Sequence, residues 1–168
     1  MSELAWRVPL ADFAATEALG AGLAVALPRL EPRGLVVYLH GDLGAGKTTL
    51  VRGWLRKLGV TGIVRSPTYT LVEPYRAGLL TCVHVDLYRL RDPSEMEDLG
   101  LRDYLQPRTI LLIEWPRMGA PWVPQPDLEI TIDYAGEARR ASLLPRTPAG
   151  ASLMEFVKIV GETDKSLI

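Results

Sequence analysis

The chain has 168 residues, with 19 Lys and Arg against 20 Asp and Glu, and 48% of its residues are apolar. This length predicts one domain, and the net charge of −1 excludes the broad basic surface that direct nucleic-acid binding needs, so contact with DNA is not expected and a link to RNA would be indirect or local. The single cysteine, Cys82, excludes an internal disulfide and a zinc site built from several cysteines. Residues 1–7 mix acidic and basic side chains and no run of 18 apolar residues occurs, so we expect a cytoplasmic protein with no membrane contact.

Strand-like and helix-like apolar patterns alternate along the chain, which is typical of an α/β fold. The two segments around Arg76-Ala77-Gly78 predict an antiparallel hairpin. The expected elements are, in chain order, a strand at Leu4–Val8, a helix at Ala11–Leu27 ended by Pro28, a strand at Leu35–Leu39, a helix at Thr48–Leu58 ended by Gly59, strands at Thr70–Tyr75 and Leu79–Leu87, a short helix from Asp92 toward Gly100, strands at Ile110–Ile113, Leu128–Tyr134 and Ala138–Leu144, and a final helix at about 150–160.

A glycine-rich segment, Gly41–Thr48, matches the pattern G-x-x-x-x-G-K-[ST] in full. It follows an expected buried strand and begins an expected helix, which is the context that phosphate binding requires. The glycines let backbone N–H groups turn toward phosphate oxygens, while Lys47 reaches the β- and γ-phosphates and Thr48 offers a hydroxyl to Mg²⁺. We therefore expect ATP and Mg²⁺ as ligands. The expected nucleotide-binding residues are Gly41, Asp42, Leu43, Gly44, Ala45, Gly46, Lys47, Thr48 and Thr49.

Two carboxylates compete for the metal side of such a site, because each ends an expected strand. Glu114 follows four apolar residues, whereas Asp86 ends a weaker strand. On strand quality we favour Glu114 as the metal-side acid and keep Asp86 as a candidate for positioning water. His84 is either a base or a packed histidine, and Ser66–Thr70 is either a loop ordered by the triphosphate or a plain Ser-Pro turn.

Four segments together resemble the TsaE family of ATPases, which act in bacterial tRNA threonylcarbamoyladenosine biosynthesis. They are Gly41–Thr49, Ser66–Glu73, His84–Arg89 and Ile113–Pro116, and they stand in the family's order and spacing between about residues 8 and 144. The resemblance implies a P-loop NTPase fold in three layers, with a central mixed, mainly parallel sheet flanked by helices, over one domain at residues 1–168. It also implies an ATPase that works with the proteins TsaD and TsaB to place threonylcarbamoyl on N6 of adenosine 37 in tRNAs reading ANN codons.

The resemblance further implies roles for single residues. Thr48 and Glu114 would bind Mg²⁺, Lys47 would contact phosphates, and Asp86 would support hydrolysis. The implied switch residues are Ser66, Thr68, Tyr69, Thr70, His84 and Asp86, the implied adenine-side residues are Phe13 and Thr16, and Arg139 is a candidate phosphate or partner contact.

Two other functions fit the phosphate loop. One is a small-molecule kinase, for which Arg89, Arg91 and Arg102 are the candidate lid residues. The other is a nucleotide-gated binding module that does not need hydrolysis. The sequence contains no Asn, which excludes the Asn-Lys-x-Asp segment of guanine-specific GTPases and the Asn that protein kinases place on their second Mg²⁺.

Overall fold

The computed structural model describes residues 5–27 and 34–163, and side chains up to residue 159. Leu4 and Pro28 of the expected elements lie outside these residues. No helix within the described ranges is both long and apolar enough to cross a membrane. The elements are β1 (Trp6–Leu10), α1 (Phe13–Ala26), β2 (Leu35–His40), α2 (Lys47–Lys57), β3 (Val72–Ala77), β4 (Leu80–Asp86), the 3₁₀ helices η2 (Pro93–Met96) and η3 (Leu101–Tyr104), β5 (Thr109–Glu114), the 3₁₀ helix η4 (Pro116–Gly119), β6 (Leu128–Ala135), β7 (Ala138–Pro145) and α3 (Pro148–Thr163).

Seven strands form one mixed sheet in the order β1-β7-β6-β2-β5-β4-β3. The four central strands, β6, β2, β5 and β4, run parallel to one another, and the hairpins β3-β4 and β6-β7 and the pair β1-β7 are antiparallel. The expected mixed sheet is confirmed, but its parallel pairings are confined to the centre and equal the antiparallel ones in number. Both edge strands carry a proline, Pro9 opposite Arg140 and Pro74 opposite Val83.

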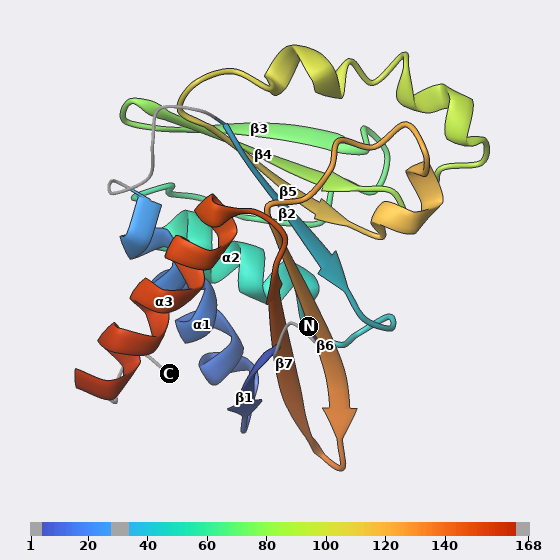
Figure 1. Ribbon diagram of the computed structural model, residues 1–168. Helices are drawn as coiled ribbons and strands as arrows, with labels where there is room; N and C mark the ends of the chain where they lie inside the picture. Colours follow the sequence, from blue (N-terminus) through green and yellow to red (C-terminus); the bar gives the residue numbers. More distant parts are fainter. Residues whose placement is uncertain (1–4, 28–33, 164–168) are drawn as a thin grey trace.

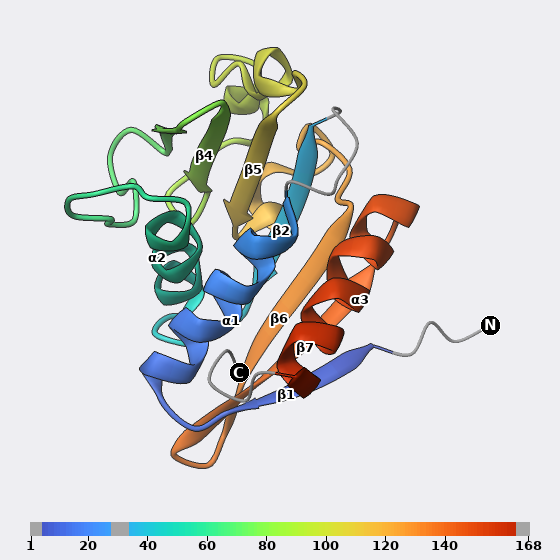
Figure 2. The same cartoon turned by 90° about the vertical axis from the view of Figure 1, so that its left-hand side faces the viewer.

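The sheet has a different layer on each face. All three α-helices cover one face, as Figures 1 and 2 show, and their apolar side chains share a core with alternate residues of the strands, such as Val37 and Leu39 of β2. Val36 and Tyr38 of the same strand point to the other face, where the 3₁₀ helices and their loops cover a second core. The three layers are therefore α-helices, sheet, and a layer of short 3₁₀ helices.

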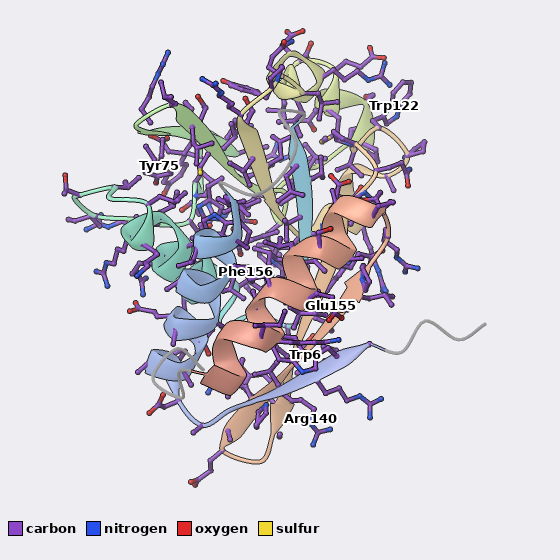
Figure 3. The ribbon with its side chains drawn as sticks, turned by 60° about the vertical axis from the view of Figure 1, so that its left-hand side comes forward. Trp6, Tyr75, Trp122, Arg140, Glu155 and Phe156 are labelled. Carbon is purple, nitrogen blue, oxygen red and sulfur yellow. The ribbon has the colours of Figure 1, made fainter. Side chains whose placement is uncertain are left out.

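Glycines let α1 and α2 approach each other closely. A Cβ at Gly20 would lie 2.1 Å from the carbonyl oxygen of Leu50, and one at Gly53 would lie 2.0 Å from that of Glu17. On the far side of α1, Phe156 of α3 lies between the two helices (Figure 3) and packs against the same core. This packing fixes α2, and with it the loop at its N-terminus, against the sheet.

Several element boundaries differ from the sequence expectation, and the strand expected at Thr70–Tyr75 lies two residues later, at Val72–Ala77. The first strand lies two residues later, at Trp6–Leu10, with Pro9 inside it. The segment after Asp92 has the expected capping box, but it makes one 3₁₀ turn to Met96 and then continues in turns to Gly100. The last helix starts at Pro148, because Thr147 accepts a hydrogen bond from the Gly150 N–H at its first turn and proline suits the first helical position.

Candidate functional site

The phosphate loop connects β2 to α2 through backbone conformations that favour glycine. Gly41 and Gly46 have φ of 138° and 113°, and a Cβ at Gly41 would lie 2.5 Å from the carbonyl oxygen of Ile132. Gly46 is the N-cap of α2, and no side chain caps the first-turn N–H groups of this helix. A helix N-terminus with open N–H groups attracts anions, so the residues present fit a phosphate.

Lys47 lies buried across the mouth of this loop. Its Nζ donates to the carbonyl oxygens of Gly41 at 2.6 Å and Asp42 at 2.8 Å, and it lies 4.4 Å from the ring centroid of Trp115. Burial lowers the pKa of the Lys47 ammonium, and the nearby Glu114 with two further carboxylates opposes this shift. The ammonium group is thus held close to the position where a phosphate would contact the loop.

Thr48 and Glu114 form the centre that fits Mg²⁺. Thr48 Oγ1 donates to Glu114 Oε1 at 2.7 Å, and His84 Nε2 lies 2.8 Å from the same oxygen. Glu114 ends β5 beside β2, and both Glu114 and His84 are buried. A threonine hydroxyl, a carboxylate and phosphate oxygens are the hard ligands that Mg²⁺ prefers, so these residues fit the metal. The structure makes His84 a buried partner of Glu114.

Asp86 ends β4 and stands opposite Glu114 in the sheet register, so both carboxylates lie at the same edge. Its Oδ2 accepts a hydrogen bond from the Ser66 hydroxyl, and its Oδ1 accepts one from the Tyr88 N–H at 3.0 Å. This pair links two of the segments that the sequence indicates as switches.

These side chains meet in one cavity of about 250 Å³. Three of its lining residues, Tyr88, Arg89 and Trp115, lie in the segments that carry the family resemblance, but the sequence analysis gave none of them a role of its own in nucleotide binding. Thr70 is not in the lining, and Tyr69 is 91% exposed, with the Arg89 guanidinium 5.5 Å from its ring centroid. The lining is made by Leu43, Gly44, Lys47, Thr48, Ser66, Thr68, Asp86, Tyr88, Arg89, Glu114 and Trp115.

A second group of side chains lies against the other side of the loop. Arg139 donates to the Gly44 carbonyl oxygen at 3.4 Å, and its guanidinium lies 4.6 Å from the ring of Phe13 and 5.1 Å from that of Tyr134. The buried Arg139 Nε has no hydrogen-bond partner among the described residues. Thr16 is buried beneath Gly46. Phe13, Thr16 and Arg139 thus border the loop, and their roles toward adenine, phosphate or a partner stay predictions. Tyr134 is the member that the sequence did not indicate.

The candidate lid arginines do not gather around the phosphate loop. Arg89 lines the 250 Å³ cavity, whereas Arg102 lines a different cavity of about 290 Å³ beside Met96 and Trp122. The arrangement required of a kinase lid is therefore incomplete.

The sequence model of the family described as "Threonylcarbamoyl adenosine biosynthesis protein TsaE" matches residues 10–142. The chain belongs to the TsaE family. The match spans the loop, Asp86, Glu114 and Arg139, so the whole site lies within the TsaE region.

Individual TsaE proteins agree with this assignment. The chain is 48% identical to the tRNA threonylcarbamoyladenosine biosynthesis protein TsaE of Haemophilus influenzae over 122 residues, which are 73% of this chain and 77% of the relative. It is 38% identical to the protein of the same name from a Nostoc species, over 90% of this chain and 91% of that one. The crystal structure of Bacillus subtilis YdiB aligns with a TM-score of 0.73 and 32% identity, over 93% of this chain and 94% of that chain. The fold and the P-loop-like nucleotide site are thus those of the TsaE family.

Proposed function

We propose that this protein is a Mg²⁺-dependent ATPase that supports transfer of threonylcarbamoyl to N6 of adenosine 37 in tRNAs reading ANN codons. One observation carries the proposal: Lys47, Thr48, Asp86 and Glu114, drawn from three elements, converge on one cavity at the mouth of a phosphate loop. Membership of the TsaE family supports the pathway. The absence of Asn from the sequence favours ATP over GTP, because the guanine-reading segment of P-loop GTPases needs Asn.

The proposed role of each residue follows from its position in the site. The loop N–H groups and Lys47 hold the β- and γ-phosphates, and Thr48 and Glu114 would hold Mg²⁺. When bound, Mg²⁺ neutralises charge on the phosphate oxygens. Asp86 orients the attacking water by accepting a hydrogen bond from it, and the Ser66 hydroxyl and Tyr88 N–H fix the carboxylate for this role. Phe13, Thr16 and Arg139 would border the nucleotide on the other side of the loop.

A partner completes the site in this proposal. Arg89 is the one arginine among the described residues that line the cavity, and its guanidinium lies 5.5 Å from the ring centroid of the exposed Tyr69. P-loop proteins without an arginine in place turn over slowly, on the order of 10⁻⁴ to 10⁻² per second, until a partner supplies the missing charge stabilisation. We infer that TsaD and TsaB are these partners, that tRNA is reached through them, and that the protein works in the cytoplasm. Hydrolysis should therefore be weak alone and faster with the partners, and an equal rate with and without them would contradict this part.

Replacing Lys47 tests the proposed function. Lys47→Ala removes the ammonium group that contacts phosphate, so ATP hydrolysis should fall by about a hundredfold or more, and threonylcarbamoyladenosine in tRNA should disappear when the variant is the sole copy in the cell. Mass spectrometry of digested tRNA measures the second effect. The matched control is Lys57→Ala, which removes an exposed lysine at the other end of α2.

The possible outcomes separate the candidate functions. Normal tRNA modification with Lys47→Ala, despite lost nucleotide binding, would favour a binding module that does not need the nucleotide. Formation of ADP that depends on an added small hydroxyl compound would favour a kinase.

A further inference from the structure

A second cavity, of about 730 Å³, shares no lining residue with the nucleotide cavity. Tyr38 and His40 of β2 and Glu129 of β6 form its floor, on the sheet face opposite the α-helices. The segment that follows β5 forms a wall with Arg117 and Val123. Its volume lies in the range of small-molecule sites, roughly 300–1,000 Å³. No role proposed above uses this cavity.

Three of the side chains that line the cavity, His40, Glu129 and Arg146, are joined by hydrogen bonds. His40 Nε2 lies 2.9 Å from Glu129 Oε2, and Arg146 Nε donates to Glu129 Oε1 at 2.8 Å. The Glu129 carboxylate is thus compensated by Arg146 and holds that guanidinium in place. Arg117 also lines the cavity and makes no ion pair with another described residue. The described lining therefore has a surplus of positive charge, which suits an anion.

The remaining walls are apolar. Val123, the Tyr38 ring and three prolines, Pro116, Pro121 and Pro126, line the cavity. The Tyr38 hydroxyl donates to the carbonyl oxygen of Pro124 at 2.5 Å, so this polar group already has a partner within the protein. A ligand with a flat or apolar body would replace water on these surfaces.

The second cavity and the nucleotide cavity have no lining residue in common among the described residues. A smaller space of about 280 Å³ lies between them: it contains Gly41, Asp42 and Trp115 on the side of the phosphate loop, and it shares His40, Arg117 and Glu129 with the large cavity. A ligand of the second cavity would therefore use residues other than those that line the nucleotide cavity.

We propose that the second cavity binds a small organic anion, with a carboxylate or phosphate group beside a flat or apolar body. Arg117 contacts the anionic group directly, and Arg146, held by Glu129, flanks it. The apolar body lies on Tyr38 and Val123. This site goes beyond the proposed ATPase function and does not depend on it.

The test uses benzoate and phenyl phosphate as anionic probes and benzyl alcohol as a neutral probe of similar shape. Each probe is titrated into the full chain, and its binding is measured from the amide NMR signals. Benzoate or phenyl phosphate should shift the amide signals of Val123, Gln125 and Thr147 with saturation, and benzyl alcohol should bind at least about tenfold more weakly. The stronger of the two anions identifies the preferred group, a carboxylate or a phosphate. Shifts confined to the phosphate loop, Gly41–Thr48, or equal binding of benzyl alcohol, would overturn the proposal.

Matched variants identify the residue that binds the anion. Arg117→Gln should weaken binding about tenfold or more, and Arg117→Lys should restore part of it because the charge returns. Arg140→Gln removes the same charge from an exposed position on β7 outside the cavity (Figure 3) and should leave the affinity unchanged. An equal loss in Arg140→Gln and Arg117→Gln would show only long-range charge attraction and would refute the site.

Discussion

Glu114 is the residue on which the candidate metal centre depends. One of its carboxylate oxygens takes a hydrogen bond from Thr48 of α2 and contacts His84 of β4, so three elements meet at a single atom. Both Glu114 and His84 are buried, and buried polar groups are costly when they lose their partners. The same contact that would orient a metal ligand therefore also stabilises the folded chain.

Two substitutions at Glu114 separate these roles. Glu114→Ala leaves the Thr48 hydroxyl and His84 Nε2 without their acceptor, so the free energy of unfolding should fall by about 2–4 kcal/mol. Glu114→Gln keeps an acceptor oxygen and should cost roughly 1 kcal/mol, while the Mg²⁺ dependence of ATP hydrolysis weakens in both variants. Urea unfolding and hydrolysis at varied Mg²⁺ measure the two effects. Glu137→Ala, at an exposed turn, serves as the control, and an equal stability loss in all three variants would contradict the assigned contacts.

At the residue scale, the sequence predicted the parts of the site that follow from local pattern. The phosphate loop is a continuous segment, and Glu114 and Asp86 end strands that are visible as apolar runs. Trp115 and Tyr134 could not be found in this way, because their contacts with Lys47 and Leu43 join segments far apart in the chain. Trp115 also has a φ of 56°, which the sequence does not indicate for a bulky residue.

Among the elements, the pair α1 and α2 determines where the phosphate loop lies. Each helix presents a glycine to the backbone of the other, at Gly20 and Gly53, so the two axes come closer than any side chain would allow. The loop leads directly into α2, so a shift of this helix would move Lys47 and Thr48 away from Glu114.

Gly53→Ala tests this close approach. The substitution would raise helix propensity by about 1 kcal/mol, but the added methyl group would lie 2.0 Å from the Glu17 carbonyl oxygen. Because both atoms belong to packed helices, we expect a net loss of about 1–3 kcal/mol in the free energy of unfolding, with weaker ATP binding. Urea unfolding of Gly53→Ala beside Lys57→Ala, which should change stability by less than about 0.5 kcal/mol, measures the loss. A gain in stability would show that the helices can separate without cost.

Element types were predictable where periodicity is strong, and boundaries were not. The hairpin around Gly78 and the strand before the loop match their apolar patterns. The capping box at Asp92 is also present, but a cap specifies where a helix begins and leaves its length and type open. After Met96 the chain turns across the second face of the sheet, and tertiary packing there decides the length and type of the helix.

At the scale of the whole molecule, the strand order brings the carboxyl ends of β2, β4 and β5 side by side. This order places the loop, Asp86 and Glu114 at one edge of the parallel sheet, where ligands bind in open α/β folds. The hairpins were predictable because their strands are consecutive. The parallel pairings were not, because strands far apart in sequence pair in many possible orders.

The folded molecule should lose stability at high pH through Tyr38. Burial, with a smaller effect of Glu129, raises the pKa of Tyr38 to about 12. The unfolded phenol titrates near pH 10, so above that pH the unfolded state releases a proton that the folded state keeps. The contribution to stability is fully present below pH 10 and is lost as the pH rises through 12, on the order of 2 kcal/mol.

Urea unfolding of the wild-type protein and of Tyr38→Phe, in buffers at about pH 8, 10 and 11.5, measures this effect. The variant should lose less stability than the wild type across this range, whereas Tyr69→Phe, at a 91% exposed position, should follow the wild type. Identical pH dependence in the wild type and Tyr38→Phe would exclude a buried phenol as the cause.

The prolines on the two edge strands have a consequence for how this protein meets other chains. Proline has no N–H to donate, and the edge strands also carry charged residues such as Arg7 and Glu73, a combination that discourages pairing with a foreign strand. Sheet growth from one copy into the next, the route to fibrous aggregates, is therefore opposed at both ends of the sheet. A partner protein therefore has to bind this molecule through its side chains and loops. A change of loop conformation can alter such an interface, while neither edge of the sheet offers a strand for pairing.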